Sequence, residues 1–139
     1  MAPGILPTEK NPMFELSDEM VSYGVGIHGE SGYRQEDYHS SAVLAVELWN
    51  KLKSQGDLKK GDEVAILVNG MGATPQMELM VFYNDLRQLV ELDNVKIRFV
   101  KIGNFMTSLD MKGVSVSCLK IKDPMWISYL NMEVDGFGW

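Results

Sequence analysis

The sequence is poor in the features that mark several classes of protein. It has one cysteine, Cys118, in 139 residues, so no disulfide can form within the chain and an oxidising compartment would add nothing. Its thirteen Lys and Arg residues are scattered and the net charge is −6, so the clustered cations that bind nucleic-acid phosphates are missing. The same acidic balance argues against binding to an anionic membrane surface.

Long apolar runs and metal-ligand clusters are also missing. No apolar run approaches the roughly 18 residues of a membrane-spanning helix. Pro3, Pro7 and Glu9 stand where a secretory signal would have its apolar stretch, so we expect a cytoplasmic protein. The two histidines, His28 and His39, are not part of a Cys/His cluster, and we therefore expect no metal site.

The rest of the composition is that of a globular protein. Hydrophobic residues make up 45% of the chain and charged residues 23%, and the length suits one domain with one core. Residues 1–13 hold three of the five prolines and show no periodicity, which predicts a linker or tail. The domain itself is expected over residues 14–139.

Hydrophobic periodicity predicts that strands and helices alternate along the domain. The expected strands are 19–27, 63–69, 95–102 and 114–121, and the expected helices are 40–53, 75–92 and a short one from 123 to about 131. No helix separates the last two strands, so that pair is expected to be antiparallel. The predicted fold is therefore a single α/β domain with a mixed β-sheet flanked by helices.

Some side chains are placed by the same periodicity. The second helix carries an apolar stripe at helical spacing, which predicts its buried face. In the third strand, alternation puts Ile97 and Phe99 on one face and Arg98 on the other. Cys118 lies in an alternating strand, which favours a buried structural thiol over a nucleophile. The stripe consists of Leu79, Phe82, Tyr83, Leu86, Leu89 and Val90.

The segment Gly24-Val-Gly-Ile-His-Gly-Glu-Ser-Gly places His28 at a strand end between small residues. It matches G-x-G-x-x-G, but a dinucleotide site needs the glycines in a turn that opens directly into a helix, and no helix is expected before about residue 40. A neutral imidazole can act as a nucleophile, a base or a ligand. The alternative is a turn histidine that bonds the local backbone, and the residues alone leave both open.

Two further loops are candidates for a binding site. Asn-Gly-Met-Gly-Ala-Thr-Pro (69–75) leads into a helix, with Thr74 as expected N-cap; it can offer backbone N–H groups to an anion, but it lacks the lysine of a P-loop. A tight strand-to-helix connection is the favoured interpretation. In the second loop, Thr107, Ser108 and Asp110 could face a ligand or bond their own backbone. No catalytic triad is defined by this order of residues.

Three segments together resemble the dihydroxyacetone kinase family, in its substrate-binding subunit of the DhaK type. They are Gly-Val-Gly-Ile-His-Gly-Glu (24–30), Val-Asn-Gly-Met-Gly-Ala-Thr-Pro with Met-Glu following (68–75, 77–78), and Thr-Ser-Leu-Asp-Met-Lys-Gly (107–113). The resemblance runs from about Phe14 to Trp139. It implies the second, C-terminal α/β domain of a two-domain subunit. The missing N-terminal domain would supply further substrate contacts, so the isolated domain is expected to be inactive and to expose hydrophobic patches.

The resemblance also implies a chemistry for His28. The matching family histidine forms a covalent hemiaminal with the carbonyl of dihydroxyacetone, which selects the ketone over glycerol and presents it for phosphorylation to dihydroxyacetone phosphate. The phosphoryl group would come from an ADP-carrying partner subunit linked to the phosphotransferase system, or from an ATP-binding domain. ADP or ATP and magnesium are expected on that partner, with no cofactor in this chain. A homodimer with a role in glycerol metabolism is expected as well.

The sequence departs from the family pattern at several positions. Ser31 stands where proline is usual, Gln76 replaces an apolar residue, and Lys112 replaces a small one. Related subunits bind dihydroxyacetone as coactivators of transcription regulators, and these departures favour that alternative, in which His28 would be retained. A structural α/β module with an idle histidine is the third possibility.

Overall fold

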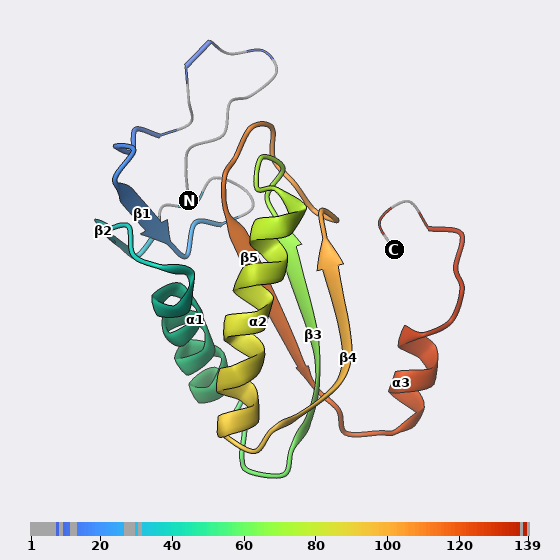
Figure 1. Cartoon of the computed structure of the whole chain (residues 1–139). Coiled ribbons are helices and arrows are strands. Elements are labelled where there is room, and N and C mark those ends of the chain that lie inside the picture. The colour runs from blue at the N-terminus through green and yellow to red at the C-terminus, as the bar shows by residue number, and fades with distance from the viewer. Residues whose placement is uncertain are drawn as a thin grey trace.

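The computed structural model describes residues 8, 10–11, 14–26, 30, 32–136 and 138. A three-stranded sheet has the strand order β4-β3-β5, and β1 and β2 form a separate antiparallel pair (Figure 1). The predicted α/β fold with a mixed sheet is confirmed. The linker 1–13 and the boundary at residue 14 stay predictions. The secondary-structure elements are β1 (Met20–Tyr23), β2 (Arg34–Asp37), α1 (Ser41–Gln55), β3 (Glu63–Gly70), α2 (Gln76–Leu92), β4 (Lys96–Gly103), β5 (Val114–Lys120) and α3 (Met125–Leu130).

The central strand β3 pairs with two strands that run in opposite directions. β4 is parallel to it and β5 is antiparallel. The strands expected to form an antiparallel pair, 95–102 and 114–121, therefore do run in opposite directions but lie on either side of β3. The apolar run Val64–Val68 fits this central position, because a continuous apolar run is typical of a strand that is covered on both faces.

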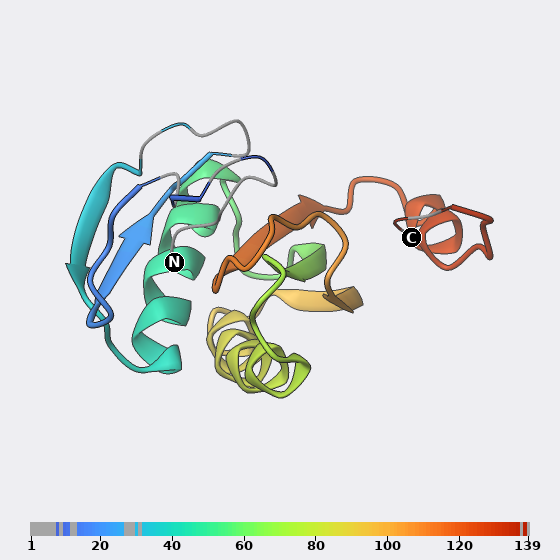
Figure 2. The same cartoon turned by 90° about the horizontal axis from the view of Figure 1, so that it is seen from above.

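Helices α1 and α2 lie side by side against one face of the sheet (Figures 1 and 2). Four positions of the predicted α2 stripe are buried, and the others are half-buried. Burying one such side chain contributes about 1.5–3 kcal/mol, so the stripe fixes which face of α2 meets the sheet. The core combines Leu79, Phe82, Leu86 and Val90 of α2 with Val64, Ile66 and Val68 of β3 and Ala45 and Trp49 of α1.

A β-bulge reverses the alternation that the sequence predicted for β4. Ile97 pairs with Val64, but the register then shifts, so that Phe99 pairs with Ala65. Phe99 and Ile97 therefore lie on opposite faces of the sheet, and the prediction that they share a face is wrong. A bulge inserts one residue into the alternation, here Arg98, and this breaks any period-2 pattern.

The first strand is shorter than predicted, and β2 was not predicted at all. β1 ends at Tyr23 because Gly24 has a left-handed φ of 72°, and a Cβ at this glycine would contact the Tyr33 ring. β2 reads Arg-Gln-Glu-Asp and has no apolar alternation to reveal it. The pair lies against α1, where the Tyr33 hydroxyl donates to Glu47 Oε1 at 3.1 Å and Lys51 Nζ lies 4.1 Å from the Tyr33 ring centroid (Figure 2).

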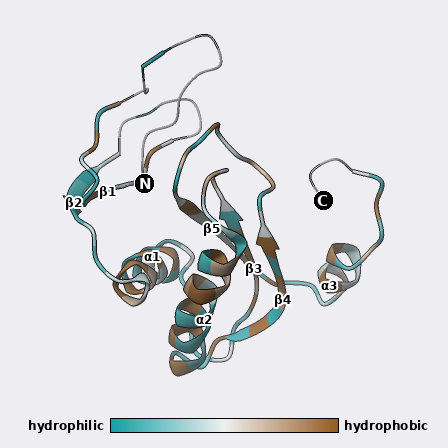
Figure 3. Cartoon of the chain, turned by 45° about the horizontal axis from the view of Figure 1, so that its top comes forward, coloured by the Kyte–Doolittle hydropathy of each residue, from teal (hydrophilic) through white to brown (hydrophobic). Residues whose placement is uncertain are grey.

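Some apolar side chains remain on the surface. Met77 of α2 is 78% exposed, and Met80 and Val81 on the next turn are also exposed. Hydrophobic residues occur both on the helix faces that meet the sheet and on outward faces (Figure 3). None of the helices in the described part of the chain is long and apolar enough to span a membrane.

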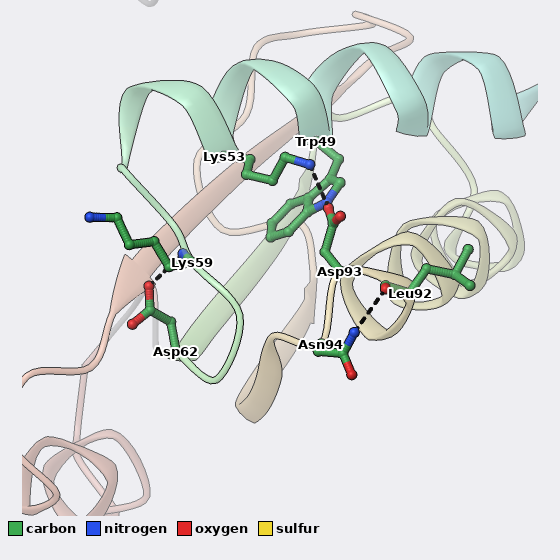
Figure 4. Close-up of polar contacts among 7 residues, drawn as sticks. All are labelled: Trp49, Lys53, Lys59, Asp62, Leu92, Asp93 and Asn94. Atoms are coloured by element: carbon green, nitrogen blue, oxygen red, sulfur yellow. Dashed lines mark hydrogen bonds and ion pairs between the residues drawn. The ribbon is translucent and has the colours of Figure 1, made fainter.

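Asp93, directly after α2, links the ends of the two helices (Figure 4). Its Oδ2 accepts hydrogen bonds from Trp49 Nε1 at 2.7 Å and from Lys53 Nζ at 2.8 Å, both on α1. The hydrogen bond from Lys53, followed by that from Trp49, lowers the pKa of the Asp93 carboxyl. The charged form of Asp93 therefore stabilises the packing of α1 on α2.

Replacing Asp93 by asparagine is expected to lower the free energy of unfolding at pH 7 by about 1 kcal/mol or less, because the pair with Lys53 is partly exposed to solvent. The pKa of Asp93 is lower in the folded state than in the unfolded state, where it is about 3.9. The stabilisation is therefore complete above about pH 4 and disappears as the pH falls through the folded-state pKa. Urea unfolding at several pH values would measure it, with Asp18→Asn, at an exposed site, as control. A pH-independent difference between Asp93→Asn and wild type would contradict the prediction.

Candidate functional site

The carboxyl ends of β3 and β4 lie at the same edge of the sheet, because the two strands are parallel. Two loops begin there: residues 71–75 connect β3 to α2, and residues 104–113 connect β4 to β5 (Figure 1). Ligands of open α/β sheets bind outside the carboxyl ends of the strands. Two of the three segments that carry the family resemblance thus come together at the edge where a site is expected.

Asn69, at the end of β3, is bonded to the start of the second loop. Asn69 is buried, with only 4% of its surface exposed. Oδ1 accepts hydrogen bonds from the backbone amides of Phe105 at 2.8 Å and Met106 at 2.9 Å. Nδ2 donates to the Met106 carbonyl at 2.7 Å and to Ser115 Oγ at 3.2 Å. One buried amide thus holds residues 105 and 106 against the end of the central strand.

Thr74 makes a corresponding link at the far end of the second loop. Its Oγ1 donates to the Gly113 carbonyl at 2.8 Å and accepts from the Gly113 amide at 2.7 Å. The expected N-cap role of Thr74 is therefore wrong: the N-cap of α2 is Pro75, and no side-chain cap bond is formed. The hydroxyl of Thr74 is committed to Gly113, which anchors the second loop to the first.

Backbone hydrogen bonds complete the connection between the two loops. The Ser108 amide donates to the Met71 carbonyl at 2.9 Å, and the Met71 amide donates to the Gly113 carbonyl at 3.1 Å. The Ala73 amide donates to the Met111 carbonyl at 3.0 Å. With both ends and the middle of loop 104–113 attached, the two loops form one unit.

Gly72 allows this close approach of the two loops. Its φ is +123°, in the region that disfavours side chains, and a Cβ at this position would collide with the Ser108 carbonyl oxygen. The glycine is thus required both by its backbone conformation and by its neighbour.

We expect Gly72→Ala to lower the free energy of unfolding by about 1–3 kcal/mol and to separate the loops. Gly61→Ala is the matched control, because Gly61 also has a positive φ, 92°, but faces open space. Urea unfolding gives the stability, and hydrogen exchange of the Ser108 amide reports the loop contact. Equal losses for the two variants, with unchanged exchange at Ser108, would show that the contact contributes nothing.

The polar side chains predicted for this loop are exposed or half-buried. Thr107 and Asp110 are exposed, and within the described part of the chain no hydrogen bond is formed by either side chain. Ser108 is half-buried and is held through its backbone amide. Asp110 has a left-handed φ of 52°, which non-glycine residues seldom adopt. Thr107 and Asp110 are therefore available to a ligand.

His28, the predicted substrate-binding residue, lies outside the described residues, as do its neighbours Ile27 and Gly29. On either side of them, the Gly26 amide donates to the Glu30 carbonyl at 3.0 Å. His39 is described and is exposed. Among the described positions no group of three His, Cys, Asp or Glu residues could hold a metal ion. The role of His28 stays a prediction.

Comparison with known proteins shows the family. The Dak1 domain model matches residues 1–137. The chain belongs to the Dak1 domain family. It is 46% identical over 134 residues to the dihydroxyacetone-binding subunit DhaK of the PTS-dependent dihydroxyacetone kinase of Lactococcus lactis, covering 96% of this chain and 40% of that protein. It is 43% identical to the DhaKLM operon coactivator DhaQ of the same organism, covering 100% of this chain and 43% of that protein.

Solved structures agree with this assignment. The Dak1 domain superposes on a dihydroxyacetone kinase operon co-activator, DhaQ, with a TM-score of 0.87 and 43% identity, over 94% of this chain and 41% of that one. The dihydroxyacetone kinase of C. freundii, at 22% identity and a TM-score of 0.81, shares the fold over 99% of this chain and 25% of its own length. The chain spans well under half of each of these relatives.

The role of Asn69 in this Dak1 domain was not predicted from the sequence, whereas the role predicted for Cys118 agrees with the structure. Asn69 was not singled out as a residue that joins the loops, although a polar residue ending the apolar run Val64–Val68 was the available signal. Cys118 is half-buried against the core, and burial raises the pKa of its thiol to about 11. This environment keeps the thiol protonated at neutral pH, in agreement with the predicted structural role.

Proposed function

We propose that this Dak1 domain is the dihydroxyacetone-binding part of a DhaK-type kinase subunit and that it holds dihydroxyacetone through His28. The observation that carries the proposal is the segment Gly-Ile-His-Gly-Glu (26–30) in a Dak1 domain 46% identical to a protein named as a dihydroxyacetone-binding subunit. The joined loops 71–75 and 104–113 add support, because they bring the other two family segments together at the carboxyl ends of β3 and β4, where open α/β sheets generally bind ligands.

The proposed chemistry is addition of an imidazole nitrogen to a ketone. The nitrogen lone pair of neutral His28 forms a bond to the carbonyl carbon, and the π electrons move to the carbonyl oxygen, which takes up the proton released by the ring. The product is a hemiaminal with both hydroxymethyl groups intact. Glycerol has no carbonyl carbon and cannot react, so the covalent bond itself provides selectivity.

Phosphorylation of the held ketone then needs a donor. We propose an ADP-carrying partner subunit of the phosphotransferase type, which would also hold magnesium, in the cytoplasm. Dihydroxyacetone phosphate would be the product. The rest of the subunit would complete the site, so residues 1–139 alone are expected to give no turnover. A homodimer remains part of this proposal.

The second candidate function is a dihydroxyacetone-sensing coactivator without catalysis. It is favoured by 43% identity to DhaQ, and by the TM-score of 0.87 with a DhaQ structure. Of the positions that depart from the kinase pattern, Gln76 donates from Nε2 to the Ile102 carbonyl at 3.3 Å, and Lys112 is exposed. Both lie in or beside the joined loops, where they could alter the contacts of a catalytic subunit while leaving His28 in place.

Binding and turnover together separate the candidates. The full natural polypeptide is first tested by calorimetry for binding of dihydroxyacetone and of glycerol. It is then tested for phosphoryl transfer with an ADP-loaded partner subunit. Ketone-selective binding with turnover supports the kinase. Ketone-selective binding without turnover moves the assignment to the coactivator. Absence of binding overturns both and leaves a structural module.

A further inference from the structure

We infer that Asn69 is a positioning residue for dihydroxyacetone binding, acting through the conformation of loop 104–113. The inference rests on the proposed function and names a residue to which the family resemblance gave no role. Asn69 lies at the end of the central strand, and its side chain contacts the loop at the two residues that directly precede Thr107.

The geometry uses the asparagine side chain fully. Its oxygen accepts hydrogen bonds from the backbone amides of two adjacent residues, Phe105 and Met106. Its nitrogen donates hydrogen bonds to the Met106 carbonyl and to Ser115 Oγ. An asparagine side chain has two acceptor and two donor positions, and all four are occupied here. Satisfied buried networks of this kind hold a single conformation, whereas a partly satisfied one is costly.

The same contacts explain why the effect should reach the ligand site. Loop 104–113 has two side-chain anchors, Asn69 at its start and Thr74 at its end. Between them lie Thr107 and Asp110, the exposed side chains that are available to a ligand. Releasing the Asn69 anchor changes where Thr107 points, while the apolar core below β3 keeps its composition.

Aspartate at position 69 provides a test with an internal switch. Asn69→Asp keeps the acceptor for the Phe105 and Met106 amides, but it sets a second carboxylate oxygen against the Met106 carbonyl, 2.7 Å from the replaced nitrogen. Burial and this carbonyl raise the pKa of the introduced carboxyl, and the two backbone amides on its other oxygen oppose that rise. A protonated carboxyl can donate to the carbonyl again, so lowering the pH restores the anchor. Asn69→Ala removes the anchor at every pH.

The experiment measures dihydroxyacetone affinity of both variants relative to wild type at each pH from 8 down to the onset of unfolding. Ratios cancel any pH dependence shared by all three proteins. We expect Asn69→Asp to bind about tenfold more weakly at pH 8, the effect of one to two lost buried hydrogen bonds, and to approach wild type as the pH falls. Asn69→Ala, which removes all four hydrogen bonds, should show a loss at least as large and without recovery.

Val90→Ala separates positioning from simple destabilisation. Val90 is fully buried near the opposite end of α2, so its truncation lowers stability without touching the loops. Its affinity for dihydroxyacetone should equal that of wild type. If Asn69→Asp does not fold, Asn69→Ala carries the test.

The outcomes distinguish this inference from the proposed function. Wild-type affinity in folded Asn69→Ala, or an Asn69→Asp ratio that stays near one at every pH, overturns the role of Asn69 while ketone binding by the wild type still stands. A wild-type protein that does not bind dihydroxyacetone overturns the proposed function and this role together.

Discussion

Dihydroxyacetone binding is expected to weaken by about 100-fold or more when His28 is replaced by alanine, because the covalent bond that holds the ketone can no longer form. Alanine cannot form the hemiaminal, and the selectivity for a ketone over glycerol should disappear with it. The change removes no residue of the described core, so the fold should persist. The loss would therefore reflect chemistry at the ketone carbon.

The covalent bond gives a direct measurement. Dihydroxyacetone labelled with carbon-13 at the carbonyl should show, on binding, conversion of a trigonal carbonyl signal into that of a tetrahedral carbon. His39→Ala is the matched control, because it removes the other histidine, which is exposed. A tetrahedral signal that survives in His28→Ala, or vanishes in His39→Ala, would assign the bond to another residue.

The largest expected effect on stability is that of Phe82→Ala. Phe82 is 4% exposed in the middle of α2 and belongs to the core cluster with Trp49 and Ile66. Truncating a buried phenylalanine removes its transfer free energy and leaves a cavity, which together cost about 3–5 kcal/mol. That is a large part of the 5–15 kcal/mol that holds a typical domain folded.

Met77→Ala, on the same helix, is the control for Phe82→Ala. Met77 is 78% exposed, so its truncation should change the free energy of unfolding by no more than about 0.5 kcal/mol. Both variants would be compared with wild type by urea denaturation followed by circular dichroism. A Phe82→Ala loss as small as that of Met77→Ala would mean that α2 does not pack on the sheet as described.

The sequence was informative where burial imposes a period. The α2 stripe predicted the buried Leu79, Phe82, Leu86 and Val90, because a helix on a sheet can bury only one face. The continuous run Val64–Val68 predicted the strand that became the centre of the sheet. In both cases the local hydrophobic pattern matches the burial that the tertiary structure imposes, so the pattern alone predicts the element and its buried residues.

The features that escaped prediction depend on contacts between distant segments. The bulge at Arg98 is fixed by the register of β4 against β3. Strand β2 has a polar sequence and pairs with β1 through its backbone. Thr74 has the sequence signature of an N-cap, but its hydroxyl bonds to Gly113. Local propensity cannot include a partner whose position is set only when the sheet has formed.

The same distinction between local patterns and distant contacts applies to the candidate site. The three family segments were recognisable from their residues, and the structure brings two of them together through Asn69, Thr74 and Gly72. Neither of the two side-chain anchors was predicted, because the hydrogen-bond partners of the buried Asn69 and the half-buried Thr74 come from segments that are distant in the sequence. The third segment, with His28, rests on the resemblance alone.

The position of β3 between two later strands has a consequence for synthesis of the protein on the ribosome. Both hydrogen-bonding partners of β3, β4 and β5, follow it in the chain. While β3 leaves the exit tunnel neither of these two partners has been synthesised, and the apolar run Val64–Val68 is then a segment prone to aggregate. The three-stranded sheet is complete only after Lys120, at the end of β5, has left the exit tunnel. Shielding of the nascent chain thus falls first to α1 and α2, which can form from local contacts before the second edge strand arrives.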